Sequence, residues 1–260
     1  MVKVGVVYSI VRDLCNKDQK GFVTPAVFNT LAEAAQLNVY NEMFNELKVA
    51  TRLRRSGSDA GRDKSAYKMV EEDLAYFIAS RVLDVAEEEE PITVTDPETG
   101  LDVDVPVEER ARVKKPDNLS RIISMHLFET NTSLEILHDI EKAKRVLNSN
   151  LSAPTDEFPV AMVFGRFSGA TDETGQYIEI YPNTISEDVV MNYYRVPVAP
   201  FYAVTEISDG FVIEDLNNSI DFELPDHYLT EVVGEIARMI GVRLRDDVLM
   251  QYGTAEITSK

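Results

Sequence analysis

The chain has 260 residues, 44% of them hydrophobic and 27% charged, a balance typical of a folded globular protein rather than a disordered one. Its 45 acidic and 26 basic residues give a net charge of −19, which argues against binding duplex DNA through its phosphates, because such binding needs clustered lysine and arginine. The single cysteine, Cys15, excludes an internal disulfide framework and a cysteine-based zinc site, and no apolar run approaches the roughly 20 residues of a membrane helix.

Two helices are predicted in the first 50 residues. Apolar residues recur at helical spacing from Val4 to Leu14 and again, as one long apolar face, from Pro25 to about Ala50. Thr24 is expected to be the N-cap of the second helix, because its hydroxyl can accept a hydrogen bond from the first free backbone amides. Pro25 suits the first helical position.

The loop before the second helix has some features of a calcium-binding loop. Asn16, Asp18 and Gly21 stand where an EF-hand has its first and third ligands and its turn glycine. Lys20 and Val27, however, occupy positions that need oxygen ligands, and a lysine ammonium repels a dication. We therefore expect a structural turn and no metal site.

A third helix is predicted from Lys64 to Val85, and a basic segment precedes it. Residues 52–64 contain five basic and two acidic residues, a local charge of +3 in an acidic chain, with serine and glycine typical of a mobile surface loop. Either the segment is a solvated connector, or it contacts an acidic neighbouring subunit. The candidate interface residues here are Arg52, Arg54, Arg55, Arg62 and Lys64.

An acidic β-hairpin is predicted next. Residues 84–109 carry eleven acidic side chains, and Ile92–Thr95 and Leu101–Val105 alternate with the period of a strand on either side of the turn Asp96–Gly100. Carboxylates that alternate along a strand spread out rather than converge, so no metal site is expected. Because exposed strand edges recruit partners, the hairpin is a second candidate interface, with Ile92, Val94, Leu101 and Val103 as its residues.

The rest of the chain is mixed. A helix is predicted at Leu134–Leu147, and three strands at Val160–Phe167, Tyr177–Tyr181 and Val189–Val196. A last helix begins near Pro225, and Gly241 separates it from a shorter helix around Asp246–Tyr252. The expected fold is α+β: a helical body at 1–86, an acidic β-hairpin insertion at 87–115, an antiparallel β-rich part at 116–224, and C-terminal helices at 225–260 that pack on the helical body.

Catalytic patterns are not found in the sequence. His126, His138 and His227 each stand alone, without a partner histidine at metal-binding spacing, so each is interpreted as a surface or packing residue. No nucleophile elbow, phosphate-binding loop, dinucleotide fingerprint or HExxH motif is present. The chain is therefore expected not to be an enzyme and to need no cofactor.

Four blocks, in order along the chain, resemble a class of virion proteins of tailed phages, notably the crAss-like phages of gut bacteria. They are Asn16–Pro25 with Phe28-Asn29 and Ala35-Gln36; Leu147–Thr155 leading to Phe158-Pro159; Ile178–Ile185 leading to Tyr194–Pro197 and Pro200; and Leu224–Tyr228 with Gly241–Asp246. The blocks span most of the chain. The basic segment 52–64 and the acidic region 84–115 match nothing in that class.

The resemblance implies a structural subunit of a ring at the portal–tail junction, in twelve copies, located in the virion neck or tail and, during assembly, in the host cytoplasm. Implied partners are further copies of itself, the portal protein, other neck or tail ring proteins, and tail fibre or muzzle components. Genomic DNA would pass through the ring without specific binding, and no membrane is involved. The acidic face, with Asp102, Asp104 and residues 87–90, would line the channel or pack on a basic neighbour. An internal capsid cargo protein and an acidic soluble enzyme remain alternatives.

Overall fold

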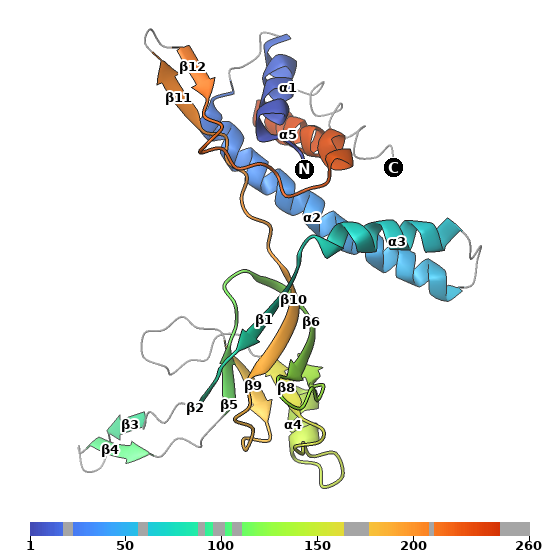
Figure 1. Cartoon of the computed structure of the whole chain (residues 1–260), viewed down its shortest axis with the longest axis vertical. Coiled ribbons are helices and arrows are strands. Elements are labelled where there is room, and N and C mark those ends of the chain that lie inside the picture. Colours follow the sequence, from blue (N-terminus) through green and yellow to red (C-terminus); the bar gives the residue numbers. More distant parts are fainter. Residues whose placement is uncertain are drawn as a thin grey trace. The chain divides into compact units, whose positions relative to one another are not determined.

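A computed structural model describes residues 1–17, 23–56, 62–87, 92–95, 102–105, 111–163, 177–207 and 211–244. The chain forms two compact units, one from residues 1–76 and 197–260 and the other from residues 77–196 (Figure 1). The first is built mainly of helices and the second mainly of strands, so the fold is α+β as predicted. The two units are called the helical unit and the strand unit below.

The helical unit contains four α-helices, one 3₁₀ helix and one hairpin within the described residues. These elements are α1 (Val4–Lys17), α2 (Pro25–Ser56), α3 (Arg62–Ala75), β11 (Val204–Ile207), β12 (Phe211–Glu214), η1 (Asp226–Tyr228) and α5 (Leu229–Leu244). The C-terminal helix α5 contacts both α1 and α2, which confirms that it returns to the N-terminal helices (Figure 1). The shorter helix expected around 246–252 lies outside the described residues.

The start of α2 follows the predicted capping pattern. The amide of Val27 donates to the Thr24 hydroxyl at 3.3 Å, the amide of Phe28 donates to the Thr24 carbonyl at 2.9 Å, and Pro25 is the first helical residue. The Phe28 ring is fully buried and packs edge-on against Tyr8 and Tyr202. The cap therefore positions a central core residue of the helical unit. The loop residues 18–22 lie outside the described part.

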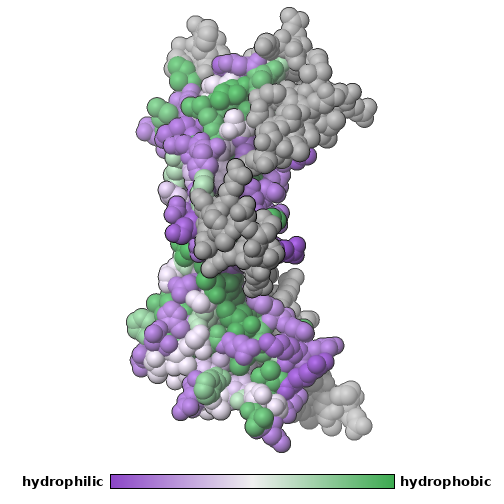
Figure 2. Space-filling model, turned by 90° about the vertical axis from the view of Figure 1, so that its right-hand side faces the viewer, coloured by the Kyte–Doolittle hydropathy of each residue, from purple (hydrophilic) through white to green (hydrophobic). Residues whose placement is uncertain are grey.

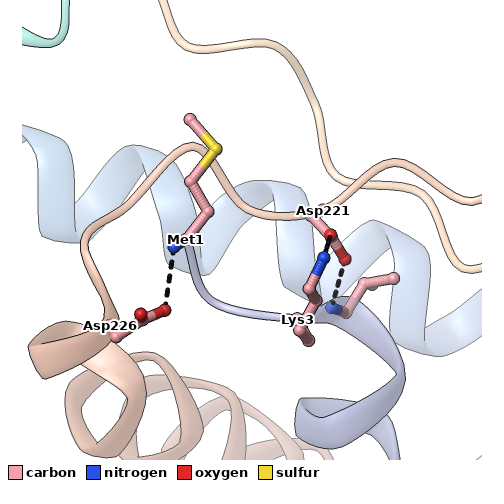
Figure 3. Close-up of polar contacts among 5 residues, drawn as sticks. Met1, Lys3, Asp221 and Asp226 are labelled. Carbon is pink, nitrogen blue, oxygen red and sulfur yellow. Dashed lines mark hydrogen bonds and ion pairs between the residues drawn. The ribbon is translucent and has the colours of Figure 1, made fainter.

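The first residues of the chain are held by a segment more than 200 positions away. The amide of Val2 donates to the Leu224 carbonyl at 3.0 Å, and the amide of Phe222 donates to the Val2 carbonyl at 3.1 Å. Asp221 accepts from the Val4 amide at 2.9 Å, which caps α1, and from the Lys3 ammonium at 2.7 Å (Figure 3). Burial alone would raise the pKa of Asp221, but these hydrogen bonds hold it below its usual range.

Two larger sheets and the two-stranded β3–β4 hairpin form the described part of the strand unit. The described strands are β1 (Ile78–Leu83), β2 (Val85–Glu87), β3 (Ile92–Thr95), β4 (Asp102–Val105), β5 (Ala111–Lys114), β6 (Leu119–Leu127), β7 (Glu135–Leu137), β8 (Val160–Val163), β9 (Tyr177–Tyr181) and β10 (Val189–Arg195). One sheet has the order β1-β10-β6 and the other β2-β5-β9-β8-β7. Both contribute to one apolar core that includes Val113, Ile178 and Met191, each fully buried. Helix α4 (Ile140–Leu147) packs on Val160 and Met162 of β8.

The predicted third helix is wrong beyond Ala75. Helix α3 ends there, and residues 78–83 form β1, which pairs antiparallel with β10, with Ile78 opposite Tyr194 and Val82 opposite Val190. Apolar residues at 77, 78 and 82 fit helical spacing, but β-branched side chains also favour strands, and the pairing with β10 decides between the two. The residues after 76 therefore belong to the strand unit and not to the helical body.

The predicted helix at Leu134–Leu147 is correct only from Ile140. Residues 135–137 form β7, which pairs parallel with β8, so the β-rich part is not purely antiparallel. Asp139 is the N-cap of α4, because its carboxylate accepts from the Glu141 amide at 2.9 Å. The three predicted strands appear as β8, β9 and β10, although residues 164–167 lie outside the described part.

Residues 197–224, expected in the β-rich part, belong to the helical unit. Two amide side chains of α2 hold this segment. Asn29 both donates to the carbonyl and accepts from the amide of Tyr202, at 3.2 and 2.8 Å, and Gln36 donates to the Val198 carbonyl at 2.7 Å and accepts from the Glu223 amide at 3.0 Å. The two side-chain amides satisfy backbone N–H and C=O groups that would pair with a neighbouring strand if this segment lay in a sheet.

Candidate functional site

The predicted acidic hairpin is present. Strands β3 and β4 pair antiparallel, with Ile92 opposite Val105, Val94 opposite Val103, and Thr93 opposite Asp104. The structure thus brings together three of the four candidate interface residues of this region, and Leu101 lies outside the described residues. Among the described strands, β3 and β4 pair only with each other.

The connection between β2 and β5 shows that the hairpin is an insertion. These strands are antiparallel neighbours in the five-stranded sheet, and Glu87 is directly opposite Ala111. Two residues that lie directly opposite each other on antiparallel strands can be joined by a two-residue turn. Residues 88–110 are therefore longer than the connection between β2 and β5 requires.

The basic segment is more helical than predicted. Arg52, Arg54 and Arg55 lie within α2, and Arg62 and Lys64 lie within α3, so the expected loop over 52–64 is wrong at both ends. Arginine, leucine and lysine are good helix formers, which explains why α2 continues to Ser56. Residues 57–61 lie outside the described part of the chain.

A second hairpin, β11–β12, was not predicted from the sequence. Val204 is opposite Glu214 and Thr205 is opposite Ile213, and in the described residues the two strands pair with no third strand. The signal was available, because Asp209-Gly210 lies between two runs rich in β-branched residues and this dipeptide favours hairpin turns.

Exposed apolar side chains concentrate around this hairpin. Phe201 is 47% exposed and forms a β-bridge with Ile220, which is 43% exposed, while Ile213 and Leu216 are 53% and 79% exposed. Figure 2 shows one face of the molecule, on which green hydrophobic groups lie among purple hydrophilic ones. Apolar groups exposed in one segment are typical of surfaces that bind another protein.

Of the three histidines, His227 has a carboxylate partner. Its Nε2 lies 3.1 Å from Oδ2 of Asp73 in α3, and the hydroxyl of the neighbouring Tyr228 donates to the same oxygen at 3.1 Å. Burial raises the pKa of Tyr228, and the Asp73 carboxylate raises it further. The cluster therefore joins the end of α3 to η1.

We expect Tyr228→Phe to lower the free energy of unfolding by about 1–3 kcal/mol, because Asp73 loses a hydrogen-bond donor. The folded protein keeps the phenol proton above the ordinary tyrosine pKa of 10.0, whereas the unfolded chain loses it. Stability is therefore expected to fall above about pH 10, by up to about 1.4 kcal/mol per pH unit for one group, and less steeply in the variant.

Chemical denaturation at pH 7 and at several pH values above 10 would measure both effects. Tyr76→Phe is the matched control, because Tyr76 is 61% exposed. If the free energy of unfolding falls equally steeply with pH above 10 in the wild type and in Tyr228→Phe, this role for Tyr228 is contradicted.

The other two histidines occupy different positions. His126 lies in β6 opposite Val190. His138 lies between β7 and α4, so its predicted position within a helix is wrong. In the described ranges, no three His, Cys, Asp or Glu side chains gather closely enough to hold a metal ion.

One carboxylate is buried in the strand unit. Glu179 of β9 is 3% exposed and lies 3.5 Å from the Arg112 guanidinium, and it accepts from the Tyr181 hydroxyl at 2.9 Å. A buried charge with an oppositely charged partner and a hydrogen-bond donor is compatible with a structural ion pair.

The scan against protein-family models finds no match, and the search of curated proteins finds none either. None of the described helices combines the length and apolar character needed to cross a bilayer.

Proposed function

We propose that the protein is a structural, non-catalytic subunit of a closed ring at the portal–tail junction of a tailed phage virion. The ring would contain twelve copies, extend the DNA channel, and contact the portal protein, other neck or tail rings, and fibre or muzzle components. This assignment comes from the resemblance of the sequence blocks. It locates the protein in the virion neck or tail.

The observation that best supports an assembly role is the pair of two-stranded hairpins, β3–β4 and β11–β12. Neither pairs with a further strand in the described part of the chain, and an isolated two-stranded hairpin is marginally stable in water. Such hairpins gain stability when a neighbouring subunit supplies a surface or another strand. The exposed apolar residues around β11–β12 point in the same direction.

The charge of the chain fits a channel. At −19, the protein repels the DNA phosphates, which would let the genome pass without sticking. In this proposal the acidic residues Asp102, Asp104 and 87–90 line the channel or contact a basic neighbour. Mapping them to the outer surface of the particle, in contact with nothing, would contradict that part.

Electron microscopy and mass measurement of the purified protein test the proposal. A closed ring with cyclic symmetry is expected, because identical head-to-tail contacts close a ring. A monomer at all accessible concentrations, or a protein packaged inside the capsid in variable copy number, would contradict it. The second outcome would favour an internal cargo protein.

Replacing residues 88–110 by Asn-Gly is expected to leave the strand unit folded and to abolish ring formation. The sheet tolerates the replacement because Glu87 and Ala111 are already opposite each other, and Asn-Gly favours the required turn. Thermal unfolding measures the first effect, and light scattering coupled to size exclusion measures the second. A shortened protein that still forms rings would show that the β3–β4 hairpin is not an assembly contact.

A further inference from the structure

A groove of about 390 Å³ lies within the helical unit, between α2 and the η1–α5 segment. This volume is within the range of pockets that hold ligands or groups of side chains, about 300–1,000 Å³. Its lining residues are Asn38, Val39, Asn41, Glu42, Met43 and Glu46 from α2, and Tyr228, Glu231, Glu235 and Arg238 from η1 and α5.

The apolar part of the groove is formed by core residues. Val39, Met43 and Tyr228 line it and are 7%, 1% and 5% exposed, so most of each side chain is packed in the core beneath. The Tyr228 hydroxyl donates to Asp73, which fixes the orientation of the ring. A bound side chain would therefore meet a surface that needs no rearrangement.

The polar part of the groove is negative. Four glutamates and one arginine line it, and the arginine is already paired, because Arg238 donates from Nε to Glu235 at 3.0 Å. Burial alone would raise the pKa of Glu235, but hydrogen bonds from Arg238 and Asn38 hold it below its usual range. Four negative charges and one positive charge leave a net charge of −3.

The negative potential reaches the base of the groove. Burial and the Asp73 carboxylate raise the pKa of Tyr228 most, and the carboxylates of Glu46 and Glu231 raise it further. An apolar surface bordered by carboxylates suits arginine best. Its aliphatic stem can cover apolar atoms, its guanidinium can stack on a tyrosine ring, and its planar fork pairs with carboxylates.

We propose that this groove binds the arginine-rich C-terminal end of α2 from a second copy of the chain. That end carries Arg52, Arg54 and Arg55, and the segment 52–64 has a charge of +3 against −3 for the groove. The proposal rests on the ring assignment and identifies one contact between adjacent subunits. Complementary charges of this kind determine which surfaces associate and in which register they do so.

The separation along α2 favours arginines from another copy over those of the same chain. Glu46 and Arg52 lie on the same helix, six residues apart, which separates them by about 9 Å along the axis and about 240° around it. Arg52 is exposed, and it lies roughly 16 Å along the axis from Asn41, the groove residue on the same side of α2. Because donor and acceptor are two different surfaces of one chain, the contact is head-to-tail and can repeat around a ring.

Charge reversal tests the contact. Glu42→Lys/Glu46→Lys and, separately, Arg52→Glu/Arg55→Glu are each expected to weaken subunit association by tenfold or more, measured by analytical ultracentrifugation. Combining all four substitutions in one chain restores the wild-type net charge and is expected to restore association. Glu33→Lys is the matched control, because Glu33 is exposed on α2 outside the groove. Circular dichroism checks that each variant is folded.

Cross-linking gives a second measurement that does not depend on affinity. Cys15 is 5% exposed, so added cysteines are the main reactive thiols. Glu42→Cys mixed with Arg55→Cys is expected to give a mixed cross-linked dimer with a short thiol-reactive linker, and Glu33→Cys mixed with Arg55→Cys is not.

The outcomes separate the two proposals. Rings that form normally in both reversal variants, without the mixed cross-link, would overturn the groove contact and leave the ring assignment intact. A wild-type protein that forms no ring would overturn the ring assignment and the contact that rests on it. Loss of association in both variants, with recovery in the combined variant, would support both.

Discussion

Replacing Gln36 by leucine is expected to lower the free energy of unfolding of the helical unit by about 2–6 kcal/mol, since two backbone groups lose their partner and each costs about 1–3 kcal/mol. Gln36 is 1% exposed, and its amide joins the Val198 carbonyl and the Glu223 amide to α2. Leucine has a similar size, so the loss comes from hydrogen bonding rather than from a cavity. Urea denaturation followed by circular dichroism measures it.

Two controls make the interpretation specific. Glu33→Leu places the same side chain at an exposed position of α2 and is expected to change stability by less than about 0.5 kcal/mol. Gln36→Glu keeps an acceptor for the Glu223 amide but turns a carboxylate toward the Val198 carbonyl. This variant should be unstable at neutral pH and recover as acid protonates the carboxyl group. A Gln36→Leu protein as stable as the wild type would show that the two hydrogen bonds contribute little.

Local signals were sufficient where a structure is determined by nearby residues. Thr24 and Pro25 predicted the start of α2 because capping involves only the first helical turn. Alternation on either side of a turn predicted β3 and β4, because a hairpin pairs residues close in sequence. The return of α5 to the N-terminal helices was also predicted correctly, although this contact is not local in sequence.

Local signals failed where distant pairing decides. Ile78 and Val82 fit helical spacing, yet they pair with strand β10, more than 100 residues later. Ile136 also fits helical spacing, yet it pairs with Ala161 of β8, 25 residues later. Periodicity in a short apolar run does not distinguish a helix from a strand, and tertiary pairing overrides it.

The candidate sites show the same division. The basic and acidic segments were visible as runs of charge, but the groove was not, because its walls come from α2 and from η1–α5, almost 190 residues apart. Its acidic residues are unremarkable in a chain with 45 of them. Only folding brings Glu46 of α2 close enough to act on the Tyr228 phenol.

Ile178→Ala is expected to destabilise the strand unit by about 2–5 kcal/mol, the usual effect of removing a large aliphatic side chain from a packed core. Ile178 is fully buried and lies between Val113 of β5 and Val163 of β8 in the five-stranded sheet. The cavity would be at the centre of the core shared by the two sheets, where neighbouring strands cannot move to fill it. Ile178→Val should cost only about 0.5–1.5 kcal/mol.

Hydrogen exchange measured by mass spectrometry assigns this loss to one unit. Because each unit has its own buried residues, peptides from β5, β8 and β9 should exchange faster in Ile178→Ala, while peptides from α1 and α2 should keep the wild-type rate. Gln36→Leu should give the reverse pattern. If both variants accelerate exchange equally throughout the chain, the two units unfold together, and a single free energy then describes the whole protein.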